Sequence, residues 1–476
     1  MNRFRRIYIL LGILGAACIA TFGVMRYEER RENIKNSEEV ILKLEKDSVK
    51  CLSWEHESET LSFRKDGTWL YEKDEAFPVD EDKINRLLEQ FESFGVSFII
   101  EDVEDYGQYG LDDPVCTIHM ETDDKSYEIL LGSYSDMDSE RYVSIGDGNA
   151  YLVKEDPLEK FDIGLGDLIK HDEVPSFEKT TRIQFTGTEN YSITREEDSN
   201  NTYCADDVYF TEGGKKPLDT SRVDSYIGKI GSLGLTNYVT YNATEEELAS
   251  YGLDSPELTV TVDYSYKNDK EEEISDSFVL HVSRKPEERD AAAETGKNKE
   301  NASGEGESEE EEITAYARVG DSQIVYQISG DAYGQFMAAS YNDLRHQEIL
   351  TADFANITQV DISLEGNTYS LMSEEKDDEQ IWYYQDEEVE LSDLKTAFAL
   401  LTAERFTEES PAQKKEISLT VYLDNEKYPE ILVELYRYDG DTCLAAVDGK
   451  PVSLVKRSAA VDLIEAVHAI VLGRVK

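Results

Sequence analysis

The sequence predicts an α+β protein in which an N-terminal transmembrane helix precedes three tandem units of mostly antiparallel sheet with covering helices. Three observations lead to this class. An apolar segment near the N-terminus is long enough to cross a membrane, a turn motif recurs at a distance, and an alternating, strand-like run follows each copy of it. Stretches with helical periodicity lie between the strands, so helices are expected to cover one face of each sheet.

An uncharged, mostly apolar segment of 19 residues extends from Ile7 to Met25. At 1.5 Å per residue such a helix spans about 28 Å, close to the roughly 30 Å of a bilayer's hydrocarbon core. Three arginines precede it and favour a cytoplasmic N-terminus: Arg3, Arg5 and Arg6. The expected order is therefore a cytoplasmic tail (1–6), a membrane anchor (7–25), a juxtamembrane segment (26–43) and an extracytoplasmic remainder.

Two other interpretations of this segment stay open. A cleaved signal peptide would usually have a shorter apolar region. Ala16-Ala17-Cys18 resembles a lipoprotein cleavage site, but Gly15 replaces the usual leucine and apolar sequence continues beyond the cysteine.

The chain as a whole is strongly acidic. There are 102 Asp and Glu against 48 Lys and Arg, which gives a formal net charge of −54. A surface this negative repels phosphates, so nucleic acid is excluded as a partner, and flat docking on anionic lipid is disfavoured. The chain is nevertheless 39% hydrophobic and 10% aromatic, which is enough apolar material for folded domains.

The turn Tyr109-Gly110-Leu111-Asp112-Asp113-Pro114 recurs as Tyr251-Gly252-Leu253-Asp254-Ser255-Pro256. The glycine can adopt the left-handed conformation, and the proline fixes the backbone where an edge strand is expected to begin. The leucine is expected to fill the core beneath. A motif that occurs once in each of two units is more economically a fold determinant than a pair of catalytic centres.

Three stretches combine a helix start with an apolar stripe at helical spacing. They begin near Asp80, Asp219 and Ser392. The stripes are Ile84, Leu87, Leu88 and Phe91; Val223, Ile227 and Ile230; and Leu394, Phe398 and Leu401. Asp80, Asp219 and either Ser392 or Asp393 are the expected N-caps. Trp69, Tyr209 and Trp382 precede these helices at matching points and are expected to anchor the core.

The second half of each unit also repeats. Two strands joined by a Gly/Asp hairpin turn are expected three times: Arg141 to Val153, Tyr316 to Ile328, and Cys443 to Val455. A closing helix follows around Pro157 to Ile169, Ala332 to Leu344, and Ala459 to Leu472. The units are therefore 44–174, 175–350 and 351–476, the last degenerate because it lacks the Tyr-Gly-Leu-Asp turn. Residues 285–312 hold 11 acidic and 4 basic residues and no aromatics, which predicts a disordered insert.

No catalytic, cofactor-binding or metal-binding residue is predicted. The six histidines form no metal pair at helical spacing, and no nucleophile elbow or phosphate loop occurs. His119 and His281 are expected to have a repeated packing role. Beyond Cys18, the cysteines Cys51, Cys116, Cys204 and Cys443 are far apart and are interpreted as small buried hydrophobes. The acidic loop from Asp136 to Glu140 lacks the glycine of a calcium-binding EF-hand and is expected to be solvated.

With its N-terminal span, Trp-x-Tyr, Pro-Val-Asp and Tyr-Gly-Leu-Asp-x-Pro motifs, the sequence resembles the bacterial family known as domain of unknown function 4340. The resemblance covers nearly all of the chain after the span, best over Leu44 to Asp172 and Phe177 to Leu350. Members are often encoded beside ABC exporters that resemble gliding-motility transport systems. The resemblance therefore implies an accessory component of the cell envelope, and it brings no catalytic residue.

The expected function is that of a noncatalytic, membrane-anchored extracytoplasmic binding or scaffold protein, with ABC transporter subunits or other envelope proteins as partners. One alternative is a stand-alone adhesin or cell-wall polymer-binding protein. The remote alternative is a hydrolase with an unrecognised site, which a deep pocket with clustered carboxylates would support.

Overall fold

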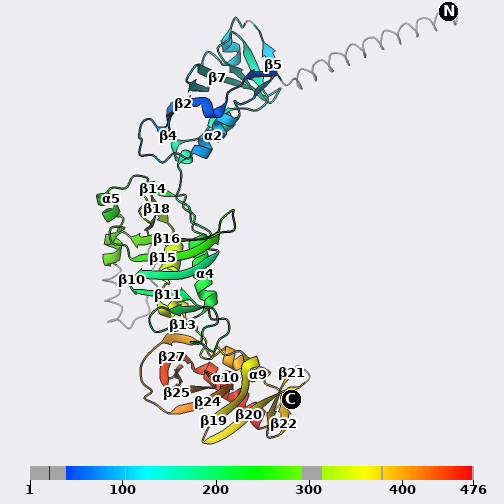
Figure 1. The fold of residues 1–476 in the computed structure, drawn as a ribbon, viewed down its shortest axis with the longest axis vertical. Helices are drawn as coiled ribbons and strands as arrows, with labels where there is room; N and C mark the ends of the chain where they lie inside the picture. Colours follow the sequence, from blue (N-terminus) through cyan, green and yellow to red (C-terminus); the bar gives the residue numbers. More distant parts are fainter. Residues whose placement is uncertain (1–20, 22–38, 102, 292–312, 377–378, 474–476) are drawn as a thin grey trace, which may run out of the picture. The chain divides into compact units, whose positions relative to one another are not determined.

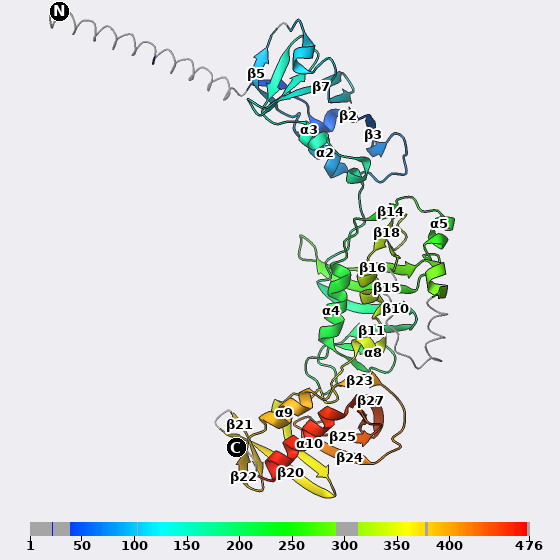
Figure 2. The same cartoon turned by 180° about the vertical axis from the view of Figure 1, so that it is seen from behind.

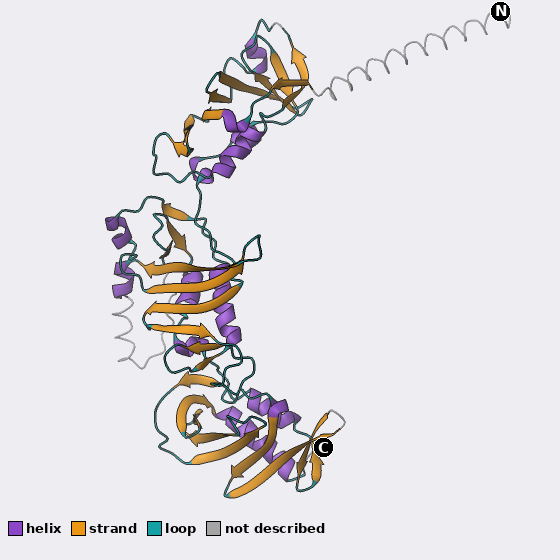
Figure 3. Cartoon of the chain, in the orientation of Figure 1, coloured by secondary structure: helices purple, strands orange, loops and turns teal. Residues whose placement is uncertain are grey.

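The computed structural model describes residues 21, 39–101, 103–291, 313–376 and 379–473 (Figure 1). The chain divides into two compact units, Met1–Asp172 and Glu173–Lys476. The first unit contains one nine-stranded sheet and the second contains two. Helices accompany each sheet (Figure 3), so the chain has the expected α+β class with three antiparallel sheets. We refer to the three sheets and their helices as repeats 1, 2 and 3.

The predicted membrane anchor at residues 7–25 lies outside the described residues, apart from Thr21. In the part of the chain that the structure does describe, no helix has the length and apolar character needed to cross a bilayer. The end of the expected juxtamembrane segment forms a strand, β1 (Glu39–Leu42), which pairs with the sheet of repeat 1.

Repeat 1 occupies the first unit. Its remaining strands are β2 (Val49–His56), β3 (Glu59–Asp66), β4 (Thr68–Tyr71), β5 (Phe94–Ile100), β6 (Cys116–Thr122), β7 (Ser126–Ser135), β8 (Glu140–Ser144) and β9 (Ala150–Val153). Its helices are η1 (Lys46–Ser48), α2 (Glu81–Glu89), η2 (Tyr106–Tyr109), α3 (Leu158–Phe161) and η3 (Leu165–Leu168).

Repeat 2 begins the second unit. Its strands are β10 (Lys179–Gly187), β11 (Tyr191–Arg195), β12 (Tyr209–Thr211), β13 (Pro217–Leu218), β14 (Tyr238–Thr240), β15 (Leu258–Lys267), β16 (Glu273–Arg284), β17 (Ala315–Val319) and β18 (Val325–Ile328). Its helices are α4 (Thr220–Gly231), α5 (Glu245–Ser250), α7 (Gly330–Met337) and α8 (Tyr341–Leu344). Figure 2 shows α4 lying across the strands of this sheet.

Repeat 3 completes the second unit. Its strands are β19 (Ile357–Leu364), β20 (Asn367–Lys376), β21 (Glu379–Tyr384), β22 (Glu387–Val389), β23 (Ala403–Phe406), β24 (Lys415–Leu423), β25 (Glu430–Arg437), β26 (Thr442–Val447) and β27 (Lys450–Lys456). Its helices are η4 (Phe354–Asn356), α9 (Ser392–Ala399) and α10 (Arg457–Val471).

The three sheets share one strand order. From one edge they run β4-β3-β2-β6-β7-β8-β9-β5 in repeat 1, β12-β11-β10-β15-β16-β17-β18-β14 in repeat 2, and β21-β20-β19-β24-β25-β26-β27-β23 in repeat 3. Only the ninth strand differs, since β1 extends one edge in repeat 1 whereas β13 and β22 extend the opposite edge in repeats 2 and 3. The internal repetition seen in the sequence is therefore a repetition of topology.

The predicted N-caps of repeats 1 and 2 and the predicted apolar stripes of all three repeats are confirmed. The Asp80 carboxylate accepts hydrogen bonds from the backbone of Asp82 and Lys83, and Asp219 does the same for Ser221 and Arg222, so both are N-caps. The predicted apolar stripes of all three helices are buried, as are the aromatic anchors Trp69, Tyr209 and Trp382.

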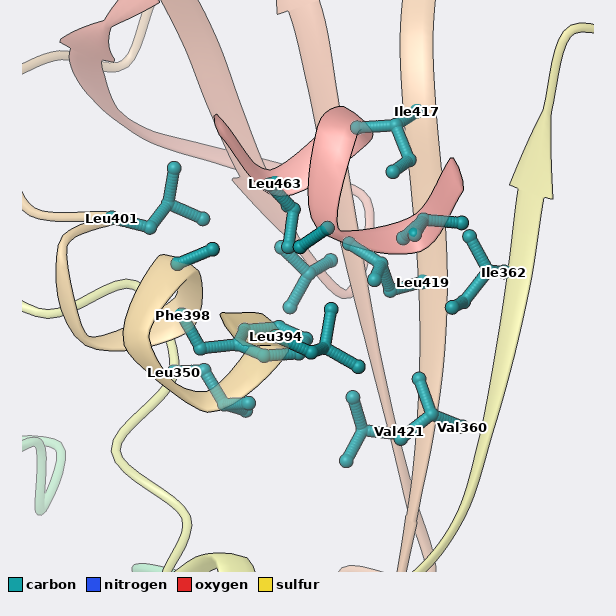
Figure 4. Packing of buried hydrophobic residues seen from close by; sticks show 14 of the residues in the cluster. Leu350, Val360, Ile362, Leu394, Phe398, Leu401, Ile417, Leu419, Val421 and Leu463 are labelled. Atoms are coloured by element: carbon teal, nitrogen blue, oxygen red, sulfur yellow. The ribbon is translucent and has the colours of Figure 1, made fainter. Parts of the chain in front are cut away.

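The core of repeat 3 shows what this burial achieves (Figure 4). Leu394 and Phe398 of α9 and Leu463 of α10 pack with Ile362 of β19 and Leu419 of β24. Each is at most 4% exposed. Burying one such side chain contributes about 1.5–3 kcal/mol, so the helices hold the sheet through the stripe that the sequence shows.

Two helix predictions for these repeats were wrong. Neither Ser392 nor Asp393 caps α9, because the helix begins at Ser392 after Leu391, which makes no side-chain cap. The closing helix is continuous only in repeat 3, as α10. In repeat 1 Gly164 adopts an extended conformation between α3 and η3, and in repeat 2 Ser340 starts a new helix by capping the backbone of Asp343.

The prediction of edge strands after the repeated turn was also wrong. β6 lies between β7 and β2, and β15 lies between β10 and β16, so both strands are central. Pro114 and Pro256 precede these strands rather than lying in them. A proline placed there removes no hydrogen bond from the ladder, so it is compatible with a central strand.

The acidic insert predicted over residues 285–312 is ordered at its start. Residues 286–291 are helical. The Arg289 guanidinium donates to the Ser255 carbonyl at 2.8 Å, and the Glu288 carboxylate accepts from the Thr314 backbone at 3.2 Å. These side chains find partners on the repeated turn and next to β17, which composition alone does not reveal. Residues 292–312 lie outside the described residues.

Candidate functional site

The repeated turn has the same construction in repeats 1 and 2. Gly110 and Gly252 have φ of 66° and 73°, so both adopt the left-handed conformation. A Cβ on Gly110 would lie 2.9 Å from the Ser133 backbone nitrogen, and one on Gly252 would lie 2.8 Å from the Ser283 hydroxyl. The turn therefore needs glycine for its φ and for its close approach to the neighbouring strand.

The side chains of the turn pack on the sheet beneath it. Leu111 and Leu253 are 3% and 4% exposed. The ring of Tyr109 lies 4.9 Å from that of Tyr142, and the ring of Tyr251 lies 4.6 Å from that of Tyr316, both at 48°. Two further members of the motif, Asp112 and Asp254, are exposed, and Pro114 and Pro256 are partly buried. The two turns belong to different compact units, and each has the contacts of a structural element.

The repeated packing role predicted for His119 and His281 was wrong. His119 lies on β6, its side chain is 48% exposed, and it faces Glu128 at 3.7 Å. His281 lies on β16, which corresponds to β7 rather than β6. Its Nδ1 contacts the Thr259 hydroxyl at 2.9 Å, and burial lowers its pKa. The two histidines therefore occupy unrelated positions.

The cysteines only partly match their prediction. Cys116 and Cys443 are buried, whereas Cys51 and Cys204 are half-buried, and all four are free thiols. Cys204 lies in the loop between β11 and β12, which we call the 196–208 loop, and not in a strand. It lies next to a group of titratable side chains in repeat 2.

This group centres on a buried aspartate and a histidine in repeat 2. The Asp207 side chain is 1% exposed, and its Oδ1 lies 2.7 Å from Nε2 of His346. Asp207 comes from the 196–208 loop and His346 follows α8. Nδ1 of His346 faces Asp219 and Glu348, each at 3.9 Å. The imidazole of His346 thus lies among three carboxylates. We call His346, Asp207, Asp219, Glu348 and Cys204 the His346 cluster.

Local hydrogen bonds hold the loop in this position. The Thr202 hydroxyl donates to Oδ2 of Asp207 at 2.6 Å and accepts from the Cys204 backbone at 3.0 Å. The Thr220 hydroxyl, at the first turn of α4, donates to the Asp206 carbonyl at 2.7 Å. The loop is therefore attached to the helix that Asp219 caps, and the cluster is assembled from three separate segments.

The charges of the His346 cluster and the burial of its members shift the pKa values of His346 and Cys204. Burial alone would lower the pKa of His346, but the hydrogen bond and charge of Asp207, with Asp219 and Glu348 behind, raise the pKa above its ordinary value. Burial, followed by the charges of Asp207 and Asp206, raises the pKa of the Cys204 thiol to about 11. The thiol is therefore protonated at neutral pH when no metal ion is bound.

The cluster contains two sets of side chains that can hold a metal ion. The ligand atoms of Cys204, Asp207 and His346 all lie within 4.8 Å of one another, as do those of Asp219, His346 and Glu348. Both sets are in repeat 2, and no further set was found among the described residues. The first offers sulfur, nitrogen and oxygen, and the second offers nitrogen and oxygen.

A cavity of about 720 Å³ adjoins the cluster. Asp219 and Glu348 form part of its wall, and Arg222 and Lys229 of α4 add two cations. Phe406 of repeat 3 closes one side, and its ring lies under the guanidinium of Arg345 at 4.2 Å. Side chains from repeats 2 and 3 therefore line the cavity together, and its wall carries both positive and negative charges.

The sequence holds a signal for this site that its histidine spacing did not reveal. Asp167-Leu168-Ile169-Lys170-His171 ends repeat 1, and Asp343-Leu344-Arg345-His346 ends repeat 2. In both repeats the histidine follows the last helix closely, although the spacing between leucine and histidine differs by one residue. Asp207 and Cys204 carry no comparable signal, because they lie in a loop that repeat 1 replaces with the tight turn between β3 and β4.

Comparison with known proteins gives one finding. The model of the family described as domain of unknown function (DUF4340) matches residues 69–211 and 209–420. Together these two matches extend over most of repeats 1, 2 and 3. Neither a search among curated proteins nor one among solved structures gives a match.

Proposed function

The chain belongs to the DUF4340 family, and we propose that it is a noncatalytic, membrane-anchored extracytoplasmic scaffold or binding protein that accompanies an ABC-type transport system. The observation that carries this proposal is the threefold sheet without a shared reactive group. Both sets of potential metal ligands among the described residues lie in repeat 2. Repeats 1 and 2 share an N-cap and a glycine turn, which serve folding, and a histidine after the closing helix whose surroundings differ between them.

The chemistry of the His346 cluster supports a role without catalysis. Cys204, His346 and Asp207 are the residue types of a cysteine nucleophile with its base and orienting acid. A reactive cysteine needs a lowered pKa, whereas the pKa of Cys204 is raised to about 11. Moreover, Nε2 of His346 is directed to Asp207. The hydrolase alternative therefore gains no support from Cys204 as a nucleophile, and the cavity beside the Asp219 and Glu348 carboxylates is the feature that would have to carry it.

The membrane part of the proposal rests on the sequence. The apolar segment from Ile7 to Met25 and the three arginines before it favour an anchor with a cytoplasmic N-terminus. A net charge of −54 would keep the body of the chain solvated and away from anionic lipid. A fusion of a periplasm-active reporter to Lys476 should be active in cells, and a cytoplasm-active reporter there should be inactive. The reverse result would contradict the topology.

The partner part of the proposal rests on the family resemblance, whose members are often encoded beside ABC exporters. Affinity capture of the tagged full-length chain from native membranes tests it. The expected result is that subunits of an ABC-type transporter are enriched over a control, an unrelated anchored protein of the same topology. If no transporter subunit is enriched, the transport role fails.

One structural observation favours the alternative of polymer binding. A cavity of about 950 Å³ in repeat 3 has Trp382 and Tyr384 in its wall, together with Glu387, Glu388 and Lys395. Aromatic and charged side chains in one groove are typical of ligand sites. Sedimentation of the full-length chain with purified cell-wall material separates the two proposals, because Tyr384→Ala should reduce binding only if the polymer occupies this groove.

A further inference from the structure

We propose that Cys204, Asp207 and His346 form a binding site for a zinc-type divalent ion that fastens repeat 2 to repeat 3. This site lies beyond the proposed function and does not depend on it. Thiolate, imidazole and carboxylate are the three side-chain ligands that Zn²⁺ takes in proteins. Softer sulfur together with nitrogen and oxygen favours a transition-type ion over Ca²⁺ or Mg²⁺, which take oxygen ligands.

The separation of the ligand atoms suits such an ion. Zinc binds sulfur at about 2.3 Å and nitrogen or oxygen at about 2.0–2.2 Å, so neighbouring ligands around it lie roughly 3.3–3.8 Å apart. The three ligand atoms here all lie within 4.8 Å of one another. The hydrogen-bonded pair of His346 Nε2 and Asp207 Oδ1, now at 2.7 Å, would have to part by about 0.6–1 Å to admit the ion.

The orientation of His346 also matches that of a metal ligand. A ligating histidine usually directs its second ring nitrogen to a carboxylate, which fixes the ring and raises its basicity. Here Nε2 is directed to Asp207, while Nδ1 faces Asp219 and Glu348 at 3.9 Å. The Thr202 hydroxyl meanwhile holds Oδ2 of Asp207 at 2.6 Å, which leaves Oδ1 for the ion.

The buried carboxylate of Asp207 favours binding of a cation at this site. A carboxylate that is removed from water needs compensation by a positive charge or several hydrogen bonds. The Asp207 side chain is 1% exposed, and it contacts the Thr202 hydroxyl, the His346 imidazole and the Cys204 thiol, none of which is a permanent cation. On binding, the ion would replace the thiol proton of Cys204, and three protein ligands leave a fourth position open to water.

The position of the site shows what the ion would do. Tyr203, the residue before Cys204, packs against the core of repeat 3 and lies 5.7 Å from the ring of Tyr428. After His346, the chain pairs with repeat 3 through Glu348 and Thr402. The proposed ion therefore joins two segments that both enter the junction between repeats 2 and 3, and binding should stiffen that junction.

The second set of ligands in the cluster is the weaker candidate. The Asp219 carboxylate already caps α4 through Oδ1, and the Glu348 side chain is 44% exposed. An exposed carboxylate gains less from a cation than a buried one. We therefore assign the ion to Cys204, Asp207 and His346.

Metal analysis of the purified full-length chain in detergent tests the proposal. After treatment with a chelator, the protein is loaded with Zn²⁺, freed of excess metal by gel filtration and analysed for zinc. The parent should retain one ion per chain, and Cys204→Ser and His346→Gln should each lose it. The matched controls Cys51→Ser and His119→Gln make the same changes in repeat 1 and should retain it.

Loading with Co²⁺ gives a second readout, which detects the thiolate ligand directly in the parent. The parent should show the thiolate-to-cobalt charge-transfer band in the near ultraviolet, and Cys51→Ser should keep it. No retained zinc, or no thiolate band in the parent, would overturn the proposal. Loss of zinc from Asp219→Asn and His346→Gln with full retention by Cys204→Ser would overturn it as well, because the ion would then belong to the second set.

Discussion

The ends of repeats 1 and 2 are built alike but surround their histidines differently. In both repeats an aspartate caps the first long helix, and the end of the last helix returns to that cap. Asp80 N donates to the Leu168 carbonyl at 2.8 Å, and Asp219 N donates to the Leu344 carbonyl at 3.1 Å. His171 and His346 follow directly. Repeats 1 and 2 therefore share one arrangement, in which the end of the repeat hydrogen-bonds to the N-cap of its first long helix.

The pKa values of the two histidines are nevertheless shifted in opposite directions. Burial, followed by the charge of Lys83, lowers the pKa of His171. The carboxylates around His346 overcome burial and raise its pKa. The largest contribution of a carboxylate to this difference comes from the 196–208 loop, which brings Asp207 to His346 and has no counterpart in repeat 1. The loop thus adds Cys204 and Asp207 as potential ligands to a histidine that Asp219 and Glu348 already face.

The largest predicted effect tests what the two repeats share. Gly110→Val and Gly252→Val should each destabilise their own unit by about 3 kcal/mol, because valine is strained at positive φ and its Cβ would overlap the adjacent strand. Urea unfolding followed by peptide-resolved hydrogen exchange would locate the loss. Gly146→Val, also at positive φ but in open space, is the control for strain alone and should cost less. Equal stability of Gly110→Val and the parent would refute the structural role of the turn.

The next prediction tests what only repeat 2 has. Asp207→Ala should destabilise the second unit by about 2–3 kcal/mol, since it removes a buried partner of His346 and two hydrogen bonds. The exposed Asp254→Ala should change stability by less than about 0.5 kcal/mol. Measured in chelator, so that metal plays no part, similar values for the two variants would mean that the buried pair contributes nothing.

A pH experiment tests a second difference between the repeats. The residue after the repeated proline is Val115 in repeat 1 and Glu257 in repeat 2. Glu257 binds Arg284 at 2.7 Å and accepts from Tyr333 at 3.1 Å. Burial would raise the pKa of Glu257, but these hydrogen bonds lower it overall.

The sign of the effect follows from that direction. A carboxyl whose folded pKa lies below its unfolded value, about 4.3 for glutamate, stabilises the fold above that value and loses the contribution as pH falls through the folded pKa. Glu257→Gln should therefore lower the stability of the second unit at pH 7 by about 2 kcal/mol and flatten its acid-side decline. Thermal unfolding from pH 7 to pH 3 checks this. An unchanged acid limb would show that Glu257 titrates normally.

The smallest effect concerns the shared helix caps. Asp80→Ala and Asp219→Ala should each cost about 1 kcal/mol, with Asp82→Ala, in the first turn of α2, as a control that keeps the cap. A markedly larger loss for Asp219 than for Asp80 would mean that the His346 cluster also stabilises repeat 2 through Asp219.

The repeated helices, strands and turns of this protein can be predicted from the sequence better than its candidate site. The recurrent turn, the helix stripes and the aromatic anchors identify the repeated elements, because each reflects local conformation or burial. The central position of β6 and β15 depends on pairing between distant strands, which a local motif does not encode. The breaks at Gly164 and Ser340 likewise depend on how the end of each repeat returns to its first helix.

The candidate site depends almost entirely on long-range contacts. Asp207 and His346 are 139 residues apart, and neither stands out in a chain with 102 acidic residues. The repeated Asp-Leu…His was visible and marks where the histidine lies. The 196–208 loop has no matching segment in repeat 1, so repetition could not indicate its role.

Hydrogen exchange of the full-length chain with and without Zn²⁺ tests the central comparison most directly. We predict that zinc slows exchange in the 196–208 loop and around His346, whereas the corresponding segment of repeat 1, residues 167–172, exchanges at the same rate in both states. Cys204→Ser should abolish the protection in repeat 2. Unchanged exchange in the loop, or equal protection at His171 and His346, would contradict the conclusion that the added loop turns the end of repeat 2 into a metal site.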